Sequence, residues 1–256
     1  MAVTIDYSGR VALVTGGTKG VGRGIAQRFA DAGATVVVCS RRLPDDVPAD
    51  WTALPVDLRE PDQASTMIEE IVSRFGRLDF LVNNAGGAPP TDSATASASF
   101  QQKIVAVNLM AAIWCSQAAN RHMQNQSDGG AIVNIGSVSA ERPAPTVAAY
   151  GAAKAGLANY TRTIGQEWLP KVRANLVTVG MVRTEQAHLH YGDEEGVQRV
   201  GSQVPIGRLA WPAEIGDVCV YLCSPLASYV SGASIEVHGG GDRPPFLDTP
   251  YHDPAR

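Results

Sequence analysis

The chain has 256 residues, of which 45% are hydrophobic and 18% are charged. This composition excludes disorder over most of the chain, because the apolar side chains suffice for a large core. A formal net charge of −4 leaves no broad basic surface, so neither nucleic acid nor an anionic membrane is expected as a partner.

Targeting and metal signals are weak in this sequence. Asp6 and Arg10 interrupt the apolar run that a signal peptide needs, and no segment reaches the ~18 apolar residues of a membrane-spanning helix. We therefore expect a cytoplasmic protein. His188 and His190 have no third ligand nearby, so no metal site is predicted. Four cysteines lack zinc-ribbon or disulfide-scaffold spacing and are expected to be free and buried: Cys39, Cys115, Cys219 and Cys223.

Short apolar runs alternate with longer amphipathic segments along the chain. The expected strands are residues 10–15, 34–40, 78–84, 130–137, 172–179 and 234–240, and the expected helices are residues 22–32, 61–76, 98–123, 150–168 and 212–224. Nearly continuous hydrophobicity is typical of strands that helices cover on both faces. The pattern predicts an α/β fold with a single Rossmann-like doubly wound parallel sheet of about seven strands and helices on both faces.

The domain organisation is expected to be simple. Residues 1–240 show no linker or internal repeat and are predicted to form a single domain, to which the motifs described below assign dinucleotide binding and catalysis. Residues 181–211 are its least regular stretch, and residues 241–256 are a proline-rich C-terminal tail.

A glycine-rich turn follows the first expected strand. Residues 15–22 read TGGTKGVG, and Gly16, Gly20 and Gly22 give the pattern TGxxxGxG. Glycines permit a tight turn and a close approach of the backbone to a pyrophosphate, while the next helix offers its N-terminal amides. The turn therefore predicts nucleotide binding.

Basic residues follow the second expected strand. The strand ends in CSRR (residues 39–42), without the carboxylate that would bind the ribose diol of NAD. A guanidinium such as that of Arg41 binds phosphate, and Lys19 adds a cation in the glycine-rich turn, which favours the 2′-phosphate of NADP. Asp45 and Asp46 are evidence against this interpretation, and a solvated arginine pair is the alternative.

Residues 150–154 read YGAAK at the start of an expected helix. Tyr150 and Lys154 stand at positions i and i+4, which share one helix face. A phenol has an ordinary pKa of about 10, and a nearby ammonium group favours the phenolate and lowers that pKa. The spacing therefore indicates a proton-transfer pair.

Together these motifs resemble the short-chain dehydrogenase/reductase family, and the resemblance covers nearly the whole chain. The matching stretches are TGGTKGVG (15–22), VDL (56–58), NNAG (83–86), VNL around Asn108, IGSVSA (135–140), YGAAK (150–154), VRANLVTVGMVRTE (172–185), PIGRLAWPAEI (205–215) and YVSGASIEVHGG (229–240). Each motif alone is weak evidence, but they occur in the order of the family.

The resemblance implies a catalytic group of Ser137, Tyr150 and Lys154, with Asn108 as a fourth member. Tyr150 is expected to act as acid and base, Ser137 to hold the substrate oxygen, and Lys154 also to bind the nicotinamide ribose. Asn108 is expected to hold a water that links Lys154 to solvent. A turn-capping role for Ser137 and a satisfied buried amide at Asn108 are the alternatives.

The resemblance also implies an NADP(H) cofactor. In this interpretation Asp57 binds the adenine amine and Thr184 meets the nicotinamide carboxamide. The full set of expected cofactor contacts is Gly16, Thr18, Lys19, Gly20, Val21, Ser40, Arg41, Arg42, Asp57, Leu58, Asn84, Ala85, Gly86, Tyr150, Lys154, Gly180, Val182 and Thr184. Two departures stand out, because Val179-Gly180 replaces the usual Pro-Gly and His238 replaces an aspartate.

The function expected from this resemblance is that of a carbonyl reductase. It is an NADP(H)-dependent oxidoreductase that interconverts a ketone, such as a 3-oxoacyl thioester, and a secondary alcohol. The alternatives are an NAD-dependent secondary-alcohol or hydroxysteroid-type dehydrogenase, a non-catalytic dinucleotide-sensing protein, and a sugar-nucleotide epimerase or dehydratase. The expected partners are a small-molecule carbonyl or alcohol substrate and further copies of the chain in a homotetramer or homodimer.

The substrate cleft is expected from four stretches, residues 88–91, 139–142, 145–147 and 181–200, with residues 181–211 forming a lid. Arg142 and Arg183 are candidates to meet a carboxylate or phosphate, or are solvated side chains.

Overall fold

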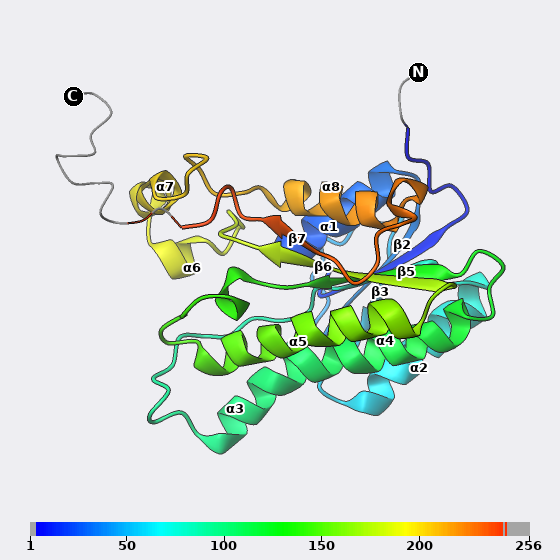
Figure 1. Cartoon of the computed structure of the whole chain (residues 1–256), viewed down its shortest axis with the longest axis horizontal. Helices are drawn as coiled ribbons and strands as arrows, with labels where there is room; N and C mark the ends of the chain where they lie inside the picture. The colour runs from blue at the N-terminus through cyan, green and yellow to red at the C-terminus, as the bar shows by residue number, and fades with distance from the viewer. Residues whose placement is uncertain (1–3, 243, 245–256) are drawn as a thin grey trace.

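A computed structural model describes residues 4–242 and 244 and contains a seven-stranded parallel sheet (Figure 1). The strand order is β3-β2-β1-β4-β5-β6-β7. The strands are β1 (Val11–Thr15), β2 (Thr35–Ser40), β3 (Thr52–Pro55), β4 (Phe80–Asn83), β5 (Gly130–Ile135), β6 (Val172–Val179) and β7 (Ser234–Val237). The predicted doubly wound parallel sheet is confirmed.

Helices cover both faces of the sheet (Figure 1). One face carries α1 (Gly20–Asp31) and α8 (Pro212–Cys223), and the other carries α2 (Pro61–Phe75), α4 (Ala111–Met123) and α5 (Ala148–Glu167). Shorter elements extend the carboxyl end of the sheet: α3 (Ala98–Val105), α6 (His188–Tyr191) and α7 (Glu194–Ser202), together with the 3₁₀ turn η2 (Val138–Ala140). A further 3₁₀ turn, η3 (Pro225–Ala227), follows α8.

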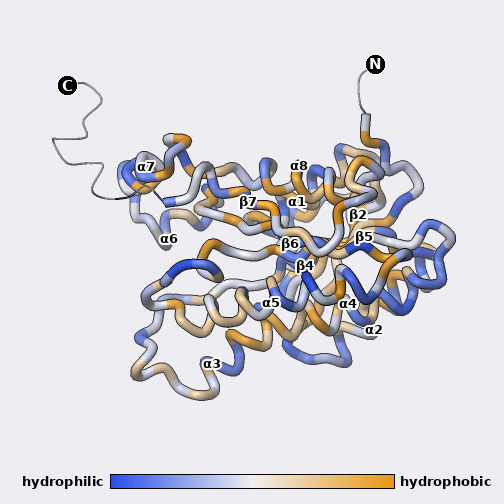
Figure 2. The backbone as a smooth tube through the Cα atoms, in the orientation of Figure 1, coloured by the Kyte–Doolittle hydropathy of each residue, from blue (hydrophilic) through white to orange (hydrophobic). Residues whose placement is uncertain are grey.

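The core has two halves because successive residues of a strand point to opposite faces of the sheet. In β1, Leu13 packs with Ile68 and Ile132 under α2 and α4, whereas Val14 packs with Phe29 under α1. Figure 2 shows hydrophobic colours along the central strands and hydrophilic colours mainly on the outer helices and turns. This two-sided burial explains why the strands lack an alternating pattern.

Two elements differ from the prediction. Strand β3 was not among the expected runs, since its sequence, TALP, is short and ends in a proline that is tolerated at the edge of the sheet. The expected helix over residues 98–123 is divided by a π-helical turn, η1 (Ala106–Met110). Such turns inside helices are frequent at functional sites, and Asn108 lies in this one.

The chain order creates a crevice at the carboxyl ends of β1 and β4. From β1 the chain winds outward to β3 on one side and then returns to β4, which pairs directly with β1. At such a reversal the connections leave in opposite directions, so the space above the strand ends stays open to a ligand. The glycine-rich turn follows β1 and the NNAG segment follows β4, so both lie at this crevice.

The four cysteines are free and buried, as predicted. In the part of the chain that the structure describes, no helix is both long and apolar enough to cross a membrane. Most of the predicted proline-rich tail, residues 243 and 245–256, lies outside the described residues.

Candidate active site

The glycine-rich turn packs against the NNAG segment. Gly16 has a φ of 63°, which favours glycine, and the Asn84 side chain donates to the Thr15 carbonyl oxygen over 2.9 Å. The Thr15 hydroxyl oxygen accepts the amides of Asn84 and Ala85, each over 3.0 Å. A Cβ atom on Gly22 would lie 2.3 Å from the Gly16 carbonyl oxygen, so the turn has this close shape only with glycine there. The structure therefore brings Gly16, Asn84 and Ala85 together at the crevice.

The first amide of α1 binds a carboxylate of this same chain. The Gly20 N–H donates to Glu185 Oε1 over 2.9 Å. The unpaired amides and the dipole at a helix N-terminus favour anions, and a carboxylate occupies that position here. The turn therefore fits the pyrophosphate that a dinucleotide would bring. Glu185 was missed by the sequence analysis, although it follows directly after Thr184 in the expected nicotinamide segment.

Basic groups border the crevice beyond β2. Arg41 and Arg42 are exposed directly after the strand, and the Ser40 hydroxyl donates to the Arg42 carbonyl oxygen over 2.8 Å. Asp46, one of the two aspartates that counted against NADP, forms an ion pair with Arg23 at 2.6 Å. The evidence against a bound 2′-phosphate is therefore weaker in the structure than in the sequence.

Asp57 is held by the neighbouring Arg59, with Arg59 Nε donating to Asp57 Oδ1 over 2.9 Å. Hydrogen bonds from Arg59 lower the Asp57 pKa, and the nearby charge of Arg41 lowers it further. Arg41 and Asp57 thus belong to one polar rim. The Leu58 side chain is buried in the core, so the expected contact of Leu58 with a cofactor would involve its backbone groups.

Tyr150 and Ser137 meet where β5 ends and α5 begins. Tyr150 lies in the first turn of α5, with the Ser137 hydroxyl beside its phenol. Burial raises the Tyr150 pKa above its ordinary value, and the neighbouring Ser137 hydroxyl acts in the opposite direction. The Ser137 hydroxyl oxygen accepts the Ser139 amide over 3.2 Å, which agrees with the alternative capping role, and a contact of Ser137 with the substrate oxygen stays a prediction.

Lys154 is buried beneath Tyr150. Its Nζ donates to the Ile135 carbonyl oxygen over 2.7 Å and lies 5.7 Å from the centre of the Tyr150 ring. Burial lowers the Lys154 pKa from its ordinary 10.5 to about 8. Desolvation of the phenol dominates the Tyr150 pKa in this structure and Lys154 Nζ is directed at a backbone carbonyl, so the expected lowering of that pKa by Lys154 stays a prediction.

The Asn108 side chain forms hydrogen bonds with the backbone that follows the NNAG segment. Its Oδ1 accepts the Gly87 amide over 2.8 Å, and its Nδ2 donates to the carbonyl oxygens of Gly87 and Ile104, each over 2.9 Å. A Cβ atom on Gly86 would lie 2.5 Å from Asn108 Oδ1 and 3.5 Å from Lys154 Nζ, so these three residues are neighbours. The geometry agrees with a satisfied buried amide, and the water link stays a prediction.

The expected nicotinamide segment follows β6. The Gly180 amide donates to the Val237 carbonyl oxygen over 3.0 Å, and Val182 forms an isolated bridge with Ala210. His238 packs against Gly180, where a Cβ atom would lie 2.7 Å from the His238 Cβ. The His238 Nε2 lies 2.8 Å from a Glu236 carboxylate oxygen. The histidine that replaces the usual aspartate of the family therefore has a polar partner nearby.

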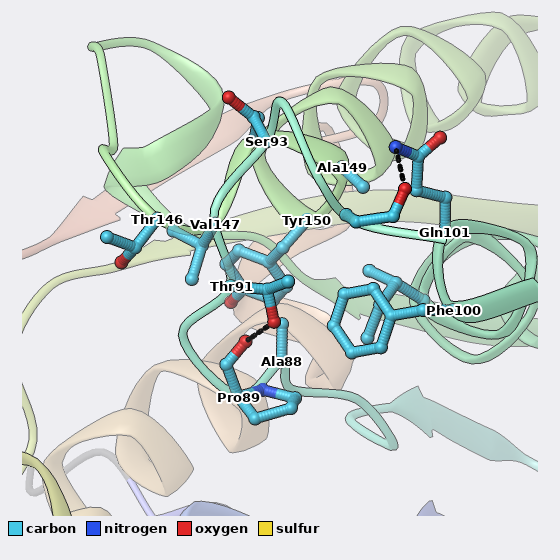
Figure 3. Close-up of a pocket in the computed structure, with 13 residues that line it drawn as sticks. Ala88, Pro89, Thr91, Ser93, Phe100, Gln101, Thr146, Val147, Ala149 and Tyr150 are labelled. Carbon is cyan, nitrogen blue, oxygen red and sulfur yellow. Dashed lines mark hydrogen bonds between the residues drawn. The ribbon is translucent and has the colours of Figure 1, made fainter. Parts of the chain in front are cut away.

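A small cavity opens beside Tyr150 (Figure 3). Its volume is about 30 Å³, and its walls come from residues 88–96, from α3 and from residues 146–150. Two of these walls coincide with predicted cleft segments. The contribution of α3, through Phe100 and Gln101, was missed by the sequence analysis. The local sequence does not show which face of a helix lines a cavity whose other walls come from distant loops.

A crevice at the sheet reversal, with a glycine-rich turn that fits an anion, defines a dinucleotide-binding α/β protein. A model of the short-chain dehydrogenase/reductase family, described as enoyl-(acyl carrier protein) reductase, matches residues 16–241. The chain therefore belongs to the short-chain dehydrogenase/reductase family. The family comprises oxidoreductases that use NAD(P)(H) and act on alcohol or carbonyl groups of small molecules.

Relatives of similar length support this assignment. The chain is 34% identical to an uncharacterized oxidoreductase of Mycobacterium tuberculosis, over 95% of this chain and 96% of the relative. It is 32% identical to the 3-oxoacyl-[acyl-carrier-protein] reductase of Aquifex aeolicus, over 92% of this chain and 98% of the relative. The ligand-free aldohexose dehydrogenase of Thermoplasma acidophilum has a similar structure, with a TM-score of 0.88, 30% identity and coverage of 95% and 98%.

Proposed function

We propose that the protein is an NADP(H)-dependent oxidoreductase that interconverts a ketone and a secondary alcohol, with Tyr150 exchanging the proton. The observation that carries the proposal is the position of the Tyr150 phenol beside Ser137 and above the buried Lys154, whose Nζ lies 5.7 Å from the centre of the Tyr150 ring, next to the crevice. Relatives named as a 3-oxoacyl reductase and as an aldohexose dehydrogenase act on carbonyl or alcohol groups, which supports the reaction class.

Ser137, Tyr150 and Lys154 each have a separate role in the proposed reduction. When bound, the reduced nicotinamide supplies a hydride to the carbonyl carbon. The hydroxyls of Ser137 and Tyr150 hold the carbonyl oxygen, and that oxygen takes the Tyr150 proton as negative charge develops on it. Lys154 places a cation beneath the phenol ring as the phenolate forms, and the phenolate then regains a proton from solvent.

The glycine-rich turn and the basic rim would hold the cofactor. The amides at the start of α1 are suited to the pyrophosphate, as the Glu185 carboxylate at Gly20 indicates. Arg41 and Arg42 would bind the 2′-phosphate, since each guanidinium forms strong charge-assisted hydrogen bonds with such a group. The segment that carries Gly180 and Thr184 would lie over the nicotinamide.

Substitution of Tyr150 by Phe tests the catalytic part of the proposal. Turnover of a ketone panel, followed by oxidation of NADPH, is expected to fall by a factor of at least ~10² because the proton donor is lost. Binding of NADPH should be retained. Unchanged turnover in this variant would overturn the mechanism.

Substitution of Arg41 by Ala tests the cofactor part. One lost charge-assisted contact is expected to weaken NADPH binding by roughly 10–100-fold and to leave NADH binding unchanged. The matched control is Arg74→Ala, at the end of α2 where the chain returns to the start of β4 at the amino end of the sheet, which should change neither affinity. Tighter binding of NADH than of NADPH by the natural protein would refute the preference.

We also propose that residues 1–240 act as one catalytic unit, in which residues 181–211 form the substrate lid. The protein is further proposed to be a homotetramer. On α5, the small residues Ala152 and Ala155 are exposed on one face, which permits a second copy of the helix to approach closely. Light scattering in solution tests the assembly, and a mass of one chain would contradict it.

A further inference from the structure

The cavity beside Tyr150 has no charged group in its lining. Phe100, Ile104 and Val147 provide apolar wall, and the remaining lining residues are small or carry hydroxyl or amide groups (Figure 3). Burying a carboxylate without a partner costs several kcal/mol, because the ion loses its hydration. The lining therefore disfavours an anionic group at this position.

Two of the polar side chains around the cavity have partners in their own chain segments. The Thr91 hydroxyl donates to the Pro89 carbonyl oxygen over 3.3 Å, and Gln101 Nε2 donates to the Ala96 carbonyl oxygen over 3.4 Å (Figure 3). These groups stiffen the walls and leave few donors for a ligand. The surface that faces the open volume is therefore mostly apolar.

The two arginines expected near the substrate are engaged by carboxylates. Arg142 forms an ion pair with Asp242. Arg183 NH2 lies 2.8 Å from Glu194 Oε2, and its guanidinium lies 5.2 Å from the centre of the Trp211 ring. A substrate carboxylate would have to displace one of these acidic partners, so the cleft offers it no ready cation in the described part of the chain.

The walls of the cavity are held at a fixed spacing. The Thr146 carbonyl oxygen accepts the Thr91 amide over 2.8 Å, which ties the loop after β4 to the loop before α5. Thr146 has a φ of 70°, a conformation that β-branched residues rarely adopt, and the surrounding contacts must therefore hold it. A volume of about 30 Å³ between such walls suits a short alkyl group.

We infer that this cavity binds a short, uncharged alkyl arm of the ketone, so that the enzyme selects neutral ketones over keto acids. The inference rests on the proposed function, because it takes Tyr150 to mark the position of the carbonyl oxygen. Phe100 limits the size of the arm, since its ring forms the α3 wall next to Tyr150 (Figure 3).

A matched pair of substrates tests the charge preference in the natural protein. Dimethyl 3-oxopentanedioate and the 3-oxopentanedioate dianion share the reacting ketone and differ in the charge of both arms, so a charged arm of the dianion faces the cavity in either orientation. With NADPH, kcat/KM is expected to be at least ~100-fold higher for the ester. Equal values, or a preference for the anion, would overturn the inference.

Two lysine variants on α3 refine the test. Gln101→Lys places a cation in the cavity wall, and Gln102→Lys places one next to it, outside the lining. Only Gln101→Lys is expected to shift the ratio of kcat/KM toward the anion, by at least ~10-fold. Equal shifts in both variants would show that the charge acts through the general field of the protein and would contradict the assignment of the cavity.

Phe100→Ala tests the size limit with a series of ketones from methyl to phenyl. The variant is expected to raise kcat/KM for the bulky members by at least ~10-fold relative to the methyl ketone. An unchanged series would refute the role of Phe100.

Binding measurements separate this inference from the proposed function. If neither 3-oxopentanedioate compound is reduced, the proposed function fails, and saturation-transfer NMR with the natural protein and NADP⁺ then reports binding of each compound. Binding of the ester alone would support the neutral cavity. Equal binding, binding of the anion alone or binding of neither compound would overturn it.

Discussion

At the scale of single residues, the site depends on groups held in environments that change their acidity. Lys154 is buried with a carbonyl oxygen as its hydrogen-bond partner, and this environment favours the neutral amine. Burial of Tyr150 likewise favours its neutral phenol. With a pKa of about 8, Lys154 still carries its charge at neutral pH, so a neutral phenol lies above an ammonium group, which suits a site that must move one proton.

The acidity of Lys154 predicts a change of stability with pH. The unfolded chain binds this proton with a pKa of 10.5 and the folded protein with a pKa of about 8. Between these values the unfolded state binds more protons, so this residue makes stability rise with pH from about 8 to 10.5. Below pH 8 Lys154 is charged in the folded protein, and the full cost of burying its ammonium group lowers stability. Because methionine carries no charge, Lys154→Met should raise the free energy of unfolding at pH 7 by about 1–3 kcal/mol.

Urea unfolding of both proteins between pH 7 and 10.5 measures this effect. Cysteines and tyrosines also titrate in this range, but they are common to both proteins and cancel in the difference. The stability gap between the variant and the natural protein should therefore close as pH rises. A constant gap would contradict the assigned acidity.

Glu185 is expected to compete with the cofactor for the start of α1. Its carboxylate accepts the Gly20 amide, and it repels a phosphate at the same position. Removing this hydrogen bond in Glu185→Ala should tighten NADPH binding by about 3–10-fold, the equivalent of about 0.5–1.5 kcal/mol. Glu195→Ala, an exposed acid of α7, is the matched control for net charge and should leave the affinity unchanged.

At the scale of elements, α1 is positioned by close packing against α8. A Cβ atom on Gly24 would lie 2.3 Å from the Pro212 Cβ, and one on Gly216 would lie 2.6 Å from the Arg28 Cγ. Small residues at both contacts let the two helices approach, and ion pairing between Arg28 and Asp217 closes the outer side. Because α1 begins at the glycine-rich turn, this contact also orients the amides that face the crevice.

Gly24→Val is therefore expected to lower the free energy of unfolding by about 2 kcal/mol, since the added methyl groups overlap with Pro212. Gln27→Val on the exposed side of the same helix introduces the same side chain without the overlap, and its small loss of helix propensity should cost less than about 0.5 kcal/mol. Denaturant unfolding compares the two variants, and equal losses would argue against the close contact.

At the scale of the whole molecule, the parallel sheet and its reversal place segments from distant parts of the chain around one crevice. The turn after β1, the NNAG segment after β4 and the start of α5 meet there, together with residues 180–185 after β6. Ligand binding to such a composite site stabilises the folded state, because the unfolded chain cannot bind the ligand.

A thermal unfolding measurement follows from this linkage. NADPH at about 100 times its Kd should add about 2.7 kcal/mol of stability, which corresponds to a Tm increase of about 5–10 °C for a chain of this size. NADH at the same concentration should raise Tm less. Absence of a shift with either dinucleotide would contradict the assignment of the crevice.

The sequence by itself determined the features that depend on neighbours along the chain. The continuous apolar runs indicated buried parallel strands, the glycine-rich turn indicated a phosphate-binding helix start, and the spacing of Tyr150 and Lys154 placed them on one helix face. These features follow from local periodicity and from the backbone freedom of glycine, so they are readable without a structure. The site residues assigned by resemblance now lie close together, while their chemical roles stay predictions.

Only the tertiary structure decided the contacts between segments that are far apart in the sequence. The Glu185 carboxylate at Gly20, the face of α3 that lines the cavity beside Tyr150 and the pairing of Arg142 with Asp242 belong to this group. The effect of burial on the acidity of Tyr150 and Lys154 belongs to it as well. Such contacts and their desolvation depend on how helices and loops pack around the sheet, which no local pattern records.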